Sequence, residues 1–297
     1  MVCLAGSLRG NMPRELGAPG LAVSSYELQL RPGLETIREL GGLHLFTNWA
    51  GLLLAYPRPP LTERVVRATE QGTTYASHID GSRHLLTPER AVQVHEALGA
   101  DISLALDDAR SAERSRRWAR RTVDARTRQD VALFGVGGAE IVADLPFDGV
   151  AFHGEVEADG VPESWPRHVL DVDGLAALFA AVEQGADSIA TETPMRLGAT
   201  GQVYASDGLV SLLDPALRED AAVIDGACAC STCAGGFSRG YLHHLFATQE
   251  LLGYTLASRH NCHVLLEVVR HIRAALAADR LWELRVDVLG RYGRGPG

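Results

Sequence analysis

The chain has 297 residues, 46% of them hydrophobic and 22% charged, which is typical of a globular protein with enough apolar residues for a sizeable core. A formal net charge of −9 argues against a protein that coats nucleic acid over its whole surface. Apolar runs are all shorter than the roughly 18 residues needed to cross a bilayer, and the sequence does not open with a charged-then-apolar leader, so we expect a cytoplasmic protein with no membrane segment.

Short apolar runs alternate with amphipathic stretches, which is typical of a parallel α/β fold. The apolar runs predict strands at Gly20–Val23, Ile102–Ala105, Ala132–Val136, Gly149–Phe152, His168–Leu170 and Ser188–Thr191. The amphipathic stretches predict helices at Leu34–Leu40, Pro88–Leu98, Ala112–Ala125, Gly174–Glu183, Tyr241–Leu256 and Val264–Ala277. The length is normal for one (β/α)8 barrel, so we predict a single TIM-type barrel over residues 1–297.

The predicted helix Ala112–Ala125 lies within an arginine-rich stretch that runs from Arg110 to Arg128. Guanidinium groups form paired hydrogen bonds with phosphates, so this stretch is a candidate RNA-facing surface. The alternative is a solvated helix face whose arginines pair with aspartate and glutamate, and it is the interpretation we favour.

Three of the five cysteines lie within six residues, as Cys228, Cys230 and Cys233. Thiolates at this spacing can converge on one soft cation, and one nitrogen ligand would complete a tetrahedral zinc shell. A tight cluster of this kind fits a metal site in a reducing compartment better than a disulfide framework. The stretch that follows is rich in histidine and offers the candidates for the nitrogen ligand, namely His243, His244, His260 and His263.

Four stretches together resemble one family, and they are Tyr26–Gly33, Ser77–Glu89, Gly99–Asp107 and Cys228–Leu245 with the later pair His260-Asn261. The chain is similar in these stretches to the tRNA-guanine transglycosylases, also called queuine tRNA-ribosyltransferases. These glycosyltransferases exchange a guanine of tRNA for a 7-deazaguanine base in queuosine or archaeosine synthesis. The resemblance implies a (β/α)8 barrel with an inserted zinc-binding segment near the C-terminus, here at about residues 220–265.

The resemblance also implies the metal ligands, which are Cys228, Cys230, Cys233 and His260. Four protein ligands leave no open position for substrate or water, so the Zn²⁺ would be structural. The adjacent pair His243 and His244 then serves helix packing and hydrogen bonding, an interpretation that we favour over ligation.

Catalysis in this family requires two aspartates, one that attacks the ribose anomeric carbon and one that transfers protons, as carboxylate pairs do in retaining glycosidases. Tyr56 stands at the position of the proton-transferring aspartate and Ala190 at that of the nucleophile. A methyl group cannot attack carbon. The chain therefore resembles a divergent paralogue that lacks both catalytic aspartates.

The base-binding pocket is expected to be altered more than erased. The resemblance implies substrate contacts from Asp107, Gly138, Gly154 and Arg196, while the family's base-reading glutamine is missing beside Gly138. Two aspartates replace glycines of a family turn that would lie at the barrel rim, at positions 171 and 173. A cation site is one interpretation of this pair, and a hydrogen-bonded turn is the one we favour.

Glu192 is the candidate for a replacement catalytic residue. If the strand that contains Ala190 continues, side chains at 190 and 192 point the same way, and Glu192 lies roughly 6–7 Å further along. Its carboxylate would attack, with Asp107 or Asp108 transferring the proton. The alternative is a carboxylate at the barrel mouth with no catalytic role.

We therefore expect a non-catalytic or base- and RNA-binding paralogue that binds tRNA and a 7-deazaguanine-type base. It would form a homodimer, or a heterodimer with an active family member, because the family assembles as dimers with the zinc segment near the interface. Candidates for an apolar dimer surface, or equally for core packing, are Leu242, Leu245, Leu251, Leu252 and Leu256. The competing hypothesis is an active but redirected transglycosylase or N-glycosidase that uses Glu192. A third is small-molecule 7-deazaguanine binding without RNA.

Overall fold

The computed structural model describes residues 1–5, 12–58, 65–206 and 208–292. Eight parallel strands close into a barrel in the order β1-β11-β10-β9-β8-β7-β3-β2. Their bounds are β1 Val2–Ala5, β2 Gly20–Ser24, β3 Leu52–Tyr56, β7 Ile102–Leu104, β8 Ala132–Val136, β9 Gly149–His153, β10 Arg167–Leu170 and β11 Ser188–Thr191. The predicted TIM-type barrel is confirmed, and its carboxyl rim gathers the segments that follow each strand.

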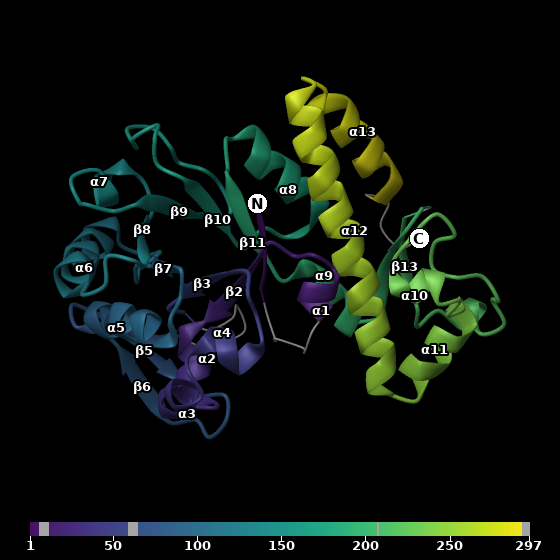
Figure 1. The fold of residues 1–297 in the computed structure, drawn as a ribbon, viewed down its shortest axis with the longest axis horizontal. Helices are drawn as coiled ribbons and strands as arrows, with labels where there is room; N and C mark the ends of the chain where they lie inside the picture. The colour runs from purple at the N-terminus through teal and green to yellow at the C-terminus, as the bar shows by residue number, and fades with distance from the viewer. Residues whose placement is uncertain (6–11, 59–64, 207, 293–297) are drawn as a thin grey trace.

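Helices surround the barrel and two small sheets extend from it (Figure 1). The helices are α1 Met12–Glu15, α2 Ser25–Leu30, α3 Leu34–Glu39, α4 Leu43–Thr47, α5 Pro88–Leu98, α6 Ala112–Ala125, α7 Ala139–Val142, α8 Gly174–Glu183, α9 Thr193–Ala199, α10 Ser231–Ala234, α11 Arg239–Ala247, α12 Leu251–Ala277 and α13 Leu281–Tyr292, with a 3-10 turn at Pro215–Leu217. A three-stranded antiparallel sheet, β4 Val65–Thr69, β5 Gly72–Ala76 and β6 Arg83–Leu86, connects β3 to α5, and the hairpin β12 Gln202–Ala205 with β13 Gly208–Ser211 precedes the metal-binding segment.

The six predicted strands are all present, within one residue at each end, but two barrel strands were missed. β1 is only four residues long, and β3 ends at Tyr56, the residue at the position of a family aspartate. The predicted helix Tyr241–Leu256 is wrong. The chain breaks between α11 and α12 because Gln249 adopts a left-handed conformation (φ 58°) without a glycine or proline to mark the turn.

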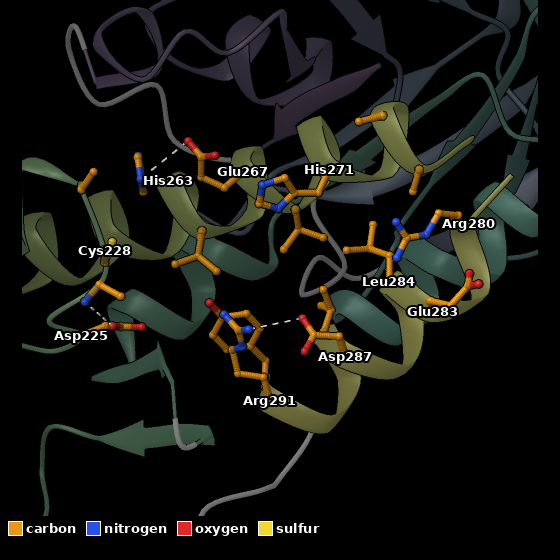
Figure 2. A pocket seen from close by; sticks show the side chains of 18 of the residues that line it. Asp225, Cys228, His263, Glu267, His271, Arg280, Glu283, Leu284, Asp287 and Arg291 are labelled. Carbon is orange, nitrogen blue, oxygen red and sulfur yellow. Dashed lines mark hydrogen bonds and ion pairs between the residues drawn. The ribbon is translucent and has the colours of Figure 1, made fainter. Parts of the chain in front are cut away.

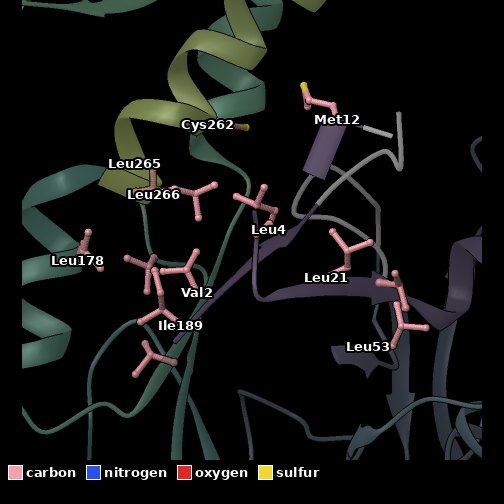
Figure 3. Close-up of a cluster of buried hydrophobic side chains, with 14 of the residues drawn as sticks. Val2, Leu4, Met12, Leu21, Leu53, Leu178, Ile189, Cys262, Leu265 and Leu266 are labelled. Atoms are coloured by element: carbon pink, nitrogen blue, oxygen red, sulfur yellow. The ribbon is translucent and has the colours of Figure 1, made fainter. Parts of the chain in front are cut away.

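Side chains alternate along the barrel strands between an inner and an outer apolar layer. Val2, Leu4 and Ile189 face outward and pack against α8 and α12, which contribute Leu178 and Leu266 (Figure 3). Their neighbours Cys3, Ala22, Leu54 and Ala190 belong to a second cluster that fills the barrel interior. Ala190 therefore faces the inside of the barrel, as its expected position as a former nucleophile requires.

The helix α12 joins the barrel to the metal-binding segment, which lies on the opposite side of this helix (Figure 1). It crosses α9 very closely, because a Cβ atom at Gly198 would lie only 2.5 Å from the backbone nitrogen of Ser258. Only glycine fits at this crossing. The first half of α12 then packs on a smaller apolar cluster that includes Val203, Leu242 and Leu256.

Candidate functional site

Three thiols and one imidazole converge at the start of α10 and in the middle of α12. The donor atoms of Cys228, Cys230, Cys233 and His260 all lie within 4.8 Å of one another. His260 Nδ1 lies 3.6 Å from Cys228 Sγ and 3.4 Å from the other two sulfurs. Zinc with its usual bond lengths and tetrahedral angles would set this sulfur–nitrogen distance at about 3.5 Å. The donor set and its spacing therefore fit Zn²⁺.

The imidazole of His260 is held in one tautomer by the backbone. Its Nε2 donates a hydrogen bond to the carbonyl of Tyr204 at 2.5 Å, which leaves Nδ1 with a lone pair that faces the sulfurs. Backbone N–H groups of Cys230 and Cys233 point at Cys228 Sγ and Cys230 Sγ, at 3.5 and 3.3 Å. Hydrogen bonds of this kind stabilise thiolate charge, which suits a metal site.

Asn261, the second residue of the His-Asn pair, fixes α12 to the end of the barrel. It is fully buried, its Oδ1 accepts from the N–H of Tyr204 at 3.1 Å, and its Nδ2 donates to the carbonyls of Pro194 and Gln202 at 3.2 and 2.8 Å. Thus Tyr204 contacts both members of the pair, through its carbonyl and its N–H. This clamp holds the metal ligand His260 at a set position relative to the barrel.

The other candidate histidines lie outside the metal cluster. His243 Nδ1 is 2.9 Å from the carbonyl of Leu212, His244 is exposed on α11, and His263 faces Glu267 at 3.9 Å. Their positions agree with the packing interpretation rather than with ligation.

A network of charged side chains occupies the carboxyl rim of the barrel. His153, at the end of β9, places Nε2 3.0 Å from Asp107 Oδ2 and Nδ1 3.3 Å from Asp171 Oδ2. Asp171 also forms an ion pair with Arg58, which follows β3. Burial disfavours a charged imidazole, but the two carboxylates outweigh it and raise the pKa of His153 to about 9. The network is therefore two anions neutralised by two cations.

The two former aspartate positions are buried. Ala190 is 3% exposed in the barrel interior, and Tyr56 is 6% exposed at the end of β3. The phenol of Tyr56 lies near the carboxylate of Glu192, and after burial the charge of Glu192 raises the pKa of this phenol. Burial, reinforced by the charge of Asp171, raises the pKa of Glu192 above its ordinary value. Glu192 therefore lies at the rim beside the position of one missing aspartate.

The strand argument for the direction of Glu192 is wrong. β11 ends at Thr191, and Glu192 has helical dihedral angles (φ −100°, ψ −9°) as the residue that precedes α9. The two-residue alternation with Ala190 does not extend to it. Its place beside Tyr56 comes from this turn instead, and sequence periodicity cannot reveal that turn.

The remaining predicted pocket residues are dispersed around the rim. Gly138 precedes α7, Gly154 follows His153 with a φ of +74°, and Arg196 lies on α9 in an ion pair with Asp173. Thr193 Oγ1 donates to the same carboxylate at 2.8 Å. Asp171 and Asp173 thus both take part in hydrogen-bonded turns with cationic partners, the favoured interpretation of this pair.

The arginine-rich helix α6 is largely committed to ion pairs. Arg114 contacts Asp108, Arg117 contacts Glu70 and Arg121 contacts Glu89. Arg120 is exposed, and within the described ranges no partner is found for it. This pattern matches the paired helix face and leaves few arginines of α6 for phosphates.

A cavity of about 970 Å³ lies between α12, α13 and the metal-binding loop (Figure 2). Cys228 lines one side of it, whereas Cys230, Cys233 and His260 are buried. The residues that line it include both acidic and basic side chains, for example Glu267 and Arg280. The cavity exposes one edge of the metal cluster, and the residues that line it do not include the barrel-rim network.

Sequence reasoning missed Arg58 and the central role of His153. The available signal was a charged or titratable residue at or within two residues of three strand ends, at positions 58, 153 and 171. Opposite charges at neighbouring strand ends predict mutual pairing when the strand order is known.

The fold and the metal cluster together define a (β/α)8 barrel with a Cys₃His metal-binding segment. A family profile described as queuine tRNA-ribosyltransferase matches residues 5–145 and 127–294, and the chain belongs to this family. A queuine tRNA-ribosyltransferase of Desulforudis audaxviator is 35% identical over 93% of this chain and 85% of its own length. Those of Novosphingobium aromaticivorans and Cereibacter sphaeroides are 34% and 33% identical over 94% of this chain and 86% and 85% of their own lengths.

The alignment with the Cereibacter sphaeroides protein spans 329 positions, more than the 297 residues of this chain, so that relative contains residues with no counterpart here. Among the described residues, none of the helices is both long enough and apolar enough to span a membrane.

Proposed function

We propose that this protein is a tRNA-binding, non-catalytic member of the queuine tRNA-ribosyltransferase family that serves tRNA modification together with an active subunit. The names of its relatives supply the substrate class, a tRNA and a queuine-type base. The barrel and the metal segment supply the scaffold. A cytoplasmic location accompanies this proposal, because thiol ligands stay reduced there.

The observation that carries the proposal is the state of Asp107. The family resemblance implies that this carboxylate binds the base. Here it contacts His153, whose second ring nitrogen faces the Asp171–Arg58 ion pair. A base that bound Asp107 Oδ2 would displace His153, and the displacement would leave partly buried charges without partners. Separating such a pair costs several kcal/mol in a buried site, on the order of 3. Standard base exchange is therefore disfavoured at this rim.

The missing carboxylates support the same conclusion. Double displacement at an anomeric carbon needs a nucleophile that forms a covalent bond and a second group that transfers protons. Ala190 offers a methyl group, and the phenol of Tyr56 stays protonated and cannot act as a base, because burial and the charge of Glu192 raise its pKa. Neither residue can perform the family reaction.

The metal would be structural. Cys228, Cys230, Cys233 and His260 would hold Zn²⁺ through three thiolates and one imidazole, and the ion would supply a cross-link between the loop and α12. Because α12 also carries Asn261, this cross-link orients the segment relative to the barrel.

A partner surface can be separated from core packing among the five candidate leucines. Leu242, Leu245 and Leu256 are at most 7% exposed and belong to the core of the metal segment. Leu251 and Leu252, at the start of α12, are 77% and 45% exposed. We propose that these two residues contribute to a dimer surface with a second copy or an active family member.

A second candidate function is a redirected transglycosylase or N-glycosidase that uses Glu192. The observation in its favour is the raised pKa and partial burial of this carboxylate at the rim, beside Tyr56. In that mechanism Glu192 attacks the anomeric carbon, and Asp107 or Asp108 protonates the departing base. Asp107 must first leave His153, and Asp108 must leave Arg114.

The test is base exchange on tRNA with labelled guanine and 7-deazaguanines, with the protein alone and with an active family member. The non-catalytic proposal expects no incorporation and no covalent RNA adduct from this chain alone, but retained tRNA binding or stimulation of the partner. The variant pair Glu192→Ala and Glu192→Gln separates the candidates, because an adduct that forms with the natural chain and vanishes in both variants would establish the enzyme. Base affinity without tRNA affinity would indicate the small-molecule binder.

The partner surface has its own variant. Leu251→Glu with Leu252→Glu should abolish association with the partner in analytical ultracentrifugation without unfolding the chain, since both side chains are exposed. Leu245→Glu is the contrasting change, which should unfold the metal segment because Leu245 is 5% exposed.

A further inference from the structure

A second cavity lies outside the barrel mouth, between α2, the start of α3, β6 and the start of α5. Its volume is about 430 Å³. α2 directly follows β2, and β6 belongs to the sheet between β3 and α5, so the cavity is built from segments that follow the carboxyl ends of barrel strands. These elements lie together at one corner of the molecule, at the purple and blue end of the chain (Figure 1). Neither the metal cluster nor the rim network lines it.

Two guanidinium groups border this cavity without a counter-charge. Arg83, on β6, and Arg90, in the first turn of α5, are both exposed and make no ion pair with any described residue. Acidic side chains are absent from the described lining. The nearest helix carboxylate in sequence, Glu89, is held by Arg121 through two hydrogen bonds of 2.6 and 2.8 Å. The cavity therefore carries an uncompensated positive charge in a protein whose net charge is −9.

The wall between these arginines is apolar and aromatic. Leu30, Leu34 and Leu86 line it together with Tyr26. The ring of Tyr26 packs on Tyr75 with centroids 4.9 Å apart and meets His84 edge-on at 6.4 Å. Tyr26 is only 2% exposed, so it forms the floor of the cavity, and the aromatic ring that a ligand can reach is that of the exposed His84.

His84 is positioned by its own hydrogen bonds. Its Nε2 lies 2.8 Å from Ser82 Oγ, and that hydroxyl donates to Asp80 Oδ1 at 2.6 Å. The ring is therefore set in place before any ligand arrives. Preorganisation of this kind lowers the entropic cost of binding.

We propose that this cavity binds a nucleoside phosphate, with Arg83 and Arg90 on the phosphate and the exposed ring of His84 against the base. Arginine forks match phosphate oxygens in paired, charge-assisted hydrogen bonds, and aromatic faces accept bases of any sequence. A volume of about 430 Å³ lies within the range of small-ligand sites. The nucleotide comes from one of two sources, a nucleotide of the bound RNA or a free mononucleotide, and only the first rests on the proposed tRNA function.

The location gives this site a functional consequence. Tyr75 packs on Tyr26, and it is close enough to Asp107 for that carboxylate, after burial, to raise the pKa of its phenol. The cavity therefore adjoins the rim network through the Tyr26–Tyr75 pair. An RNA strand bound at the barrel rim would pass beside it, so the cavity would hold a nucleotide next to the one at the rim.

The experiment measures binding of guanosine 5′-monophosphate, guanosine and unmodified tRNA to the full chain and to the double variant Arg83→Gln with Arg90→Gln. The matched control is Arg67→Gln, an exposed arginine of β4 in the same sheet that does not line the cavity. Thermal unfolding of all proteins checks that the exposed substitutions leave the fold intact.

If the nucleotide is free, the double variant should bind guanosine 5′-monophosphate at least about 10-fold more weakly, since two charge-assisted contacts are lost. Guanosine should bind the natural chain more weakly than the monophosphate does. If the nucleotide belongs to RNA, only tRNA affinity falls, and the slope of log K against log salt decreases by about 2. The control should stay within twofold of the natural chain for both ligands.

The proposal is overturned if the double variant and the natural chain bind both ligands within twofold of each other, or if neither ligand binds the natural chain. The readout is independent of catalysis. Discovery of base exchange by this chain would refute the non-catalytic function and leave the binding result unchanged.

Discussion

The metal cluster and the barrel rim are built from different kinds of contact. The metal cluster brings together three sulfurs and one nitrogen at mutual distances that fit a bound cation. The rim unites charges of both signs that neutralise one another, as in the series Asp107, His153, Asp171 and Arg58. The metal cluster is thus complementary to an ion from outside the chain, whereas the charged side chains of the rim pair with one another.

This contrast separates two functions of one fold. A structural ion needs only that its four donors keep their spacing, and they do. A catalytic rim needs groups that are left unsatisfied until substrate arrives, because binding and transition-state stabilisation use those free groups. At this rim the expected base-binding carboxylate already has a partner.

The largest expected effect is the loss of the metal-binding segment on removal of one ligand. Cys230→Ala leaves three donors, and structural zinc sites supply on the order of 10 kcal/mol of folding free energy in small domains. The variant should lose its zinc, and the segment around α10 and α11 should become protease-sensitive. Metal analysis by mass spectrometry and limited proteolysis measure both effects.

His244→Ala is the matched control, since His244 is exposed and lies outside the cluster. It should retain one equivalent of zinc. One equivalent of zinc in Cys230→Ala, or none in the natural chain, would show that the four donors do not form the metal site.

A smaller loss of stability is expected at the clamp between α12 and the barrel. Asn261→Ala removes three buried hydrogen bonds and leaves the N–H of Tyr204 and two carbonyls without partners, which should cost about 3 kcal/mol. Zinc content should stay near one equivalent, because the ligands are intact. Urea unfolding measures the loss.

Asn261→Asp is the companion variant. It keeps the acceptor for Tyr204 but places an anionic oxygen against the carbonyls of Pro194 and Gln202, so it should be at least as destabilising. Unfolding free energies within 0.5 kcal/mol of the natural protein for both variants would exclude the clamp.

The difference between the two regions also explains what sequence could predict. Three metal ligands lie within six residues, so local spacing reveals them, and the fourth followed from the family motif. The rim is assembled from the ends of β3, β7, β9 and β10, and its residues are up to 113 positions apart in sequence, from Arg58 to Asp171. Spacing alone contains no information on which of these ends are neighbours.

Local conformation set the other limit. Alternation of side chains along a strand applies as far as Thr191, where β11 ends. It failed one residue later at Glu192, where the chain turns into α9. The prediction of one helix across α11 and α12 failed for a related reason. Gln249 between them adopts a positive φ, a conformation that a glycine in the sequence would normally indicate.

A pH-dependent effect is expected from His153. Its folded-state pKa of about 9 is above the ordinary value of 6.5, so it stabilises the fold fully below pH 6.5, and this contribution is lost as pH rises through about 9. The loss should be about 3 kcal/mol between pH 6.5 and 9.5. Urea unfolding across this range measures it, and NMR titration of the His153 ring reports the pKa directly.

The variant His153→Gln lacks the titrating group. Its free energy of unfolding should therefore change less than that of the natural chain over the same pH range, by the contribution of His153. Equal pH dependence in the two proteins would show that His153 is not protonated between its carboxylates.

The smallest effect, and the sharpest for the rim, is expected at Asp171, which combines a pairing role with an unfavourable backbone conformation. Its φ is +59°, in the left-handed region where a non-glycine residue costs about 1 kcal/mol. Asp171→Ala loses the contacts with Arg58 and His153 and keeps the strain. Asp171→Gly loses the same contacts and relieves it. The glycine variant should therefore be more stable than the alanine variant by about 1 kcal/mol, as measured by urea unfolding, while the pKa of His153 falls equally in both. If the two variants are equally stable and the pKa of His153 does not change, Asp171 stabilises neither the turn nor the charge network, and it is not the central anion of the rim.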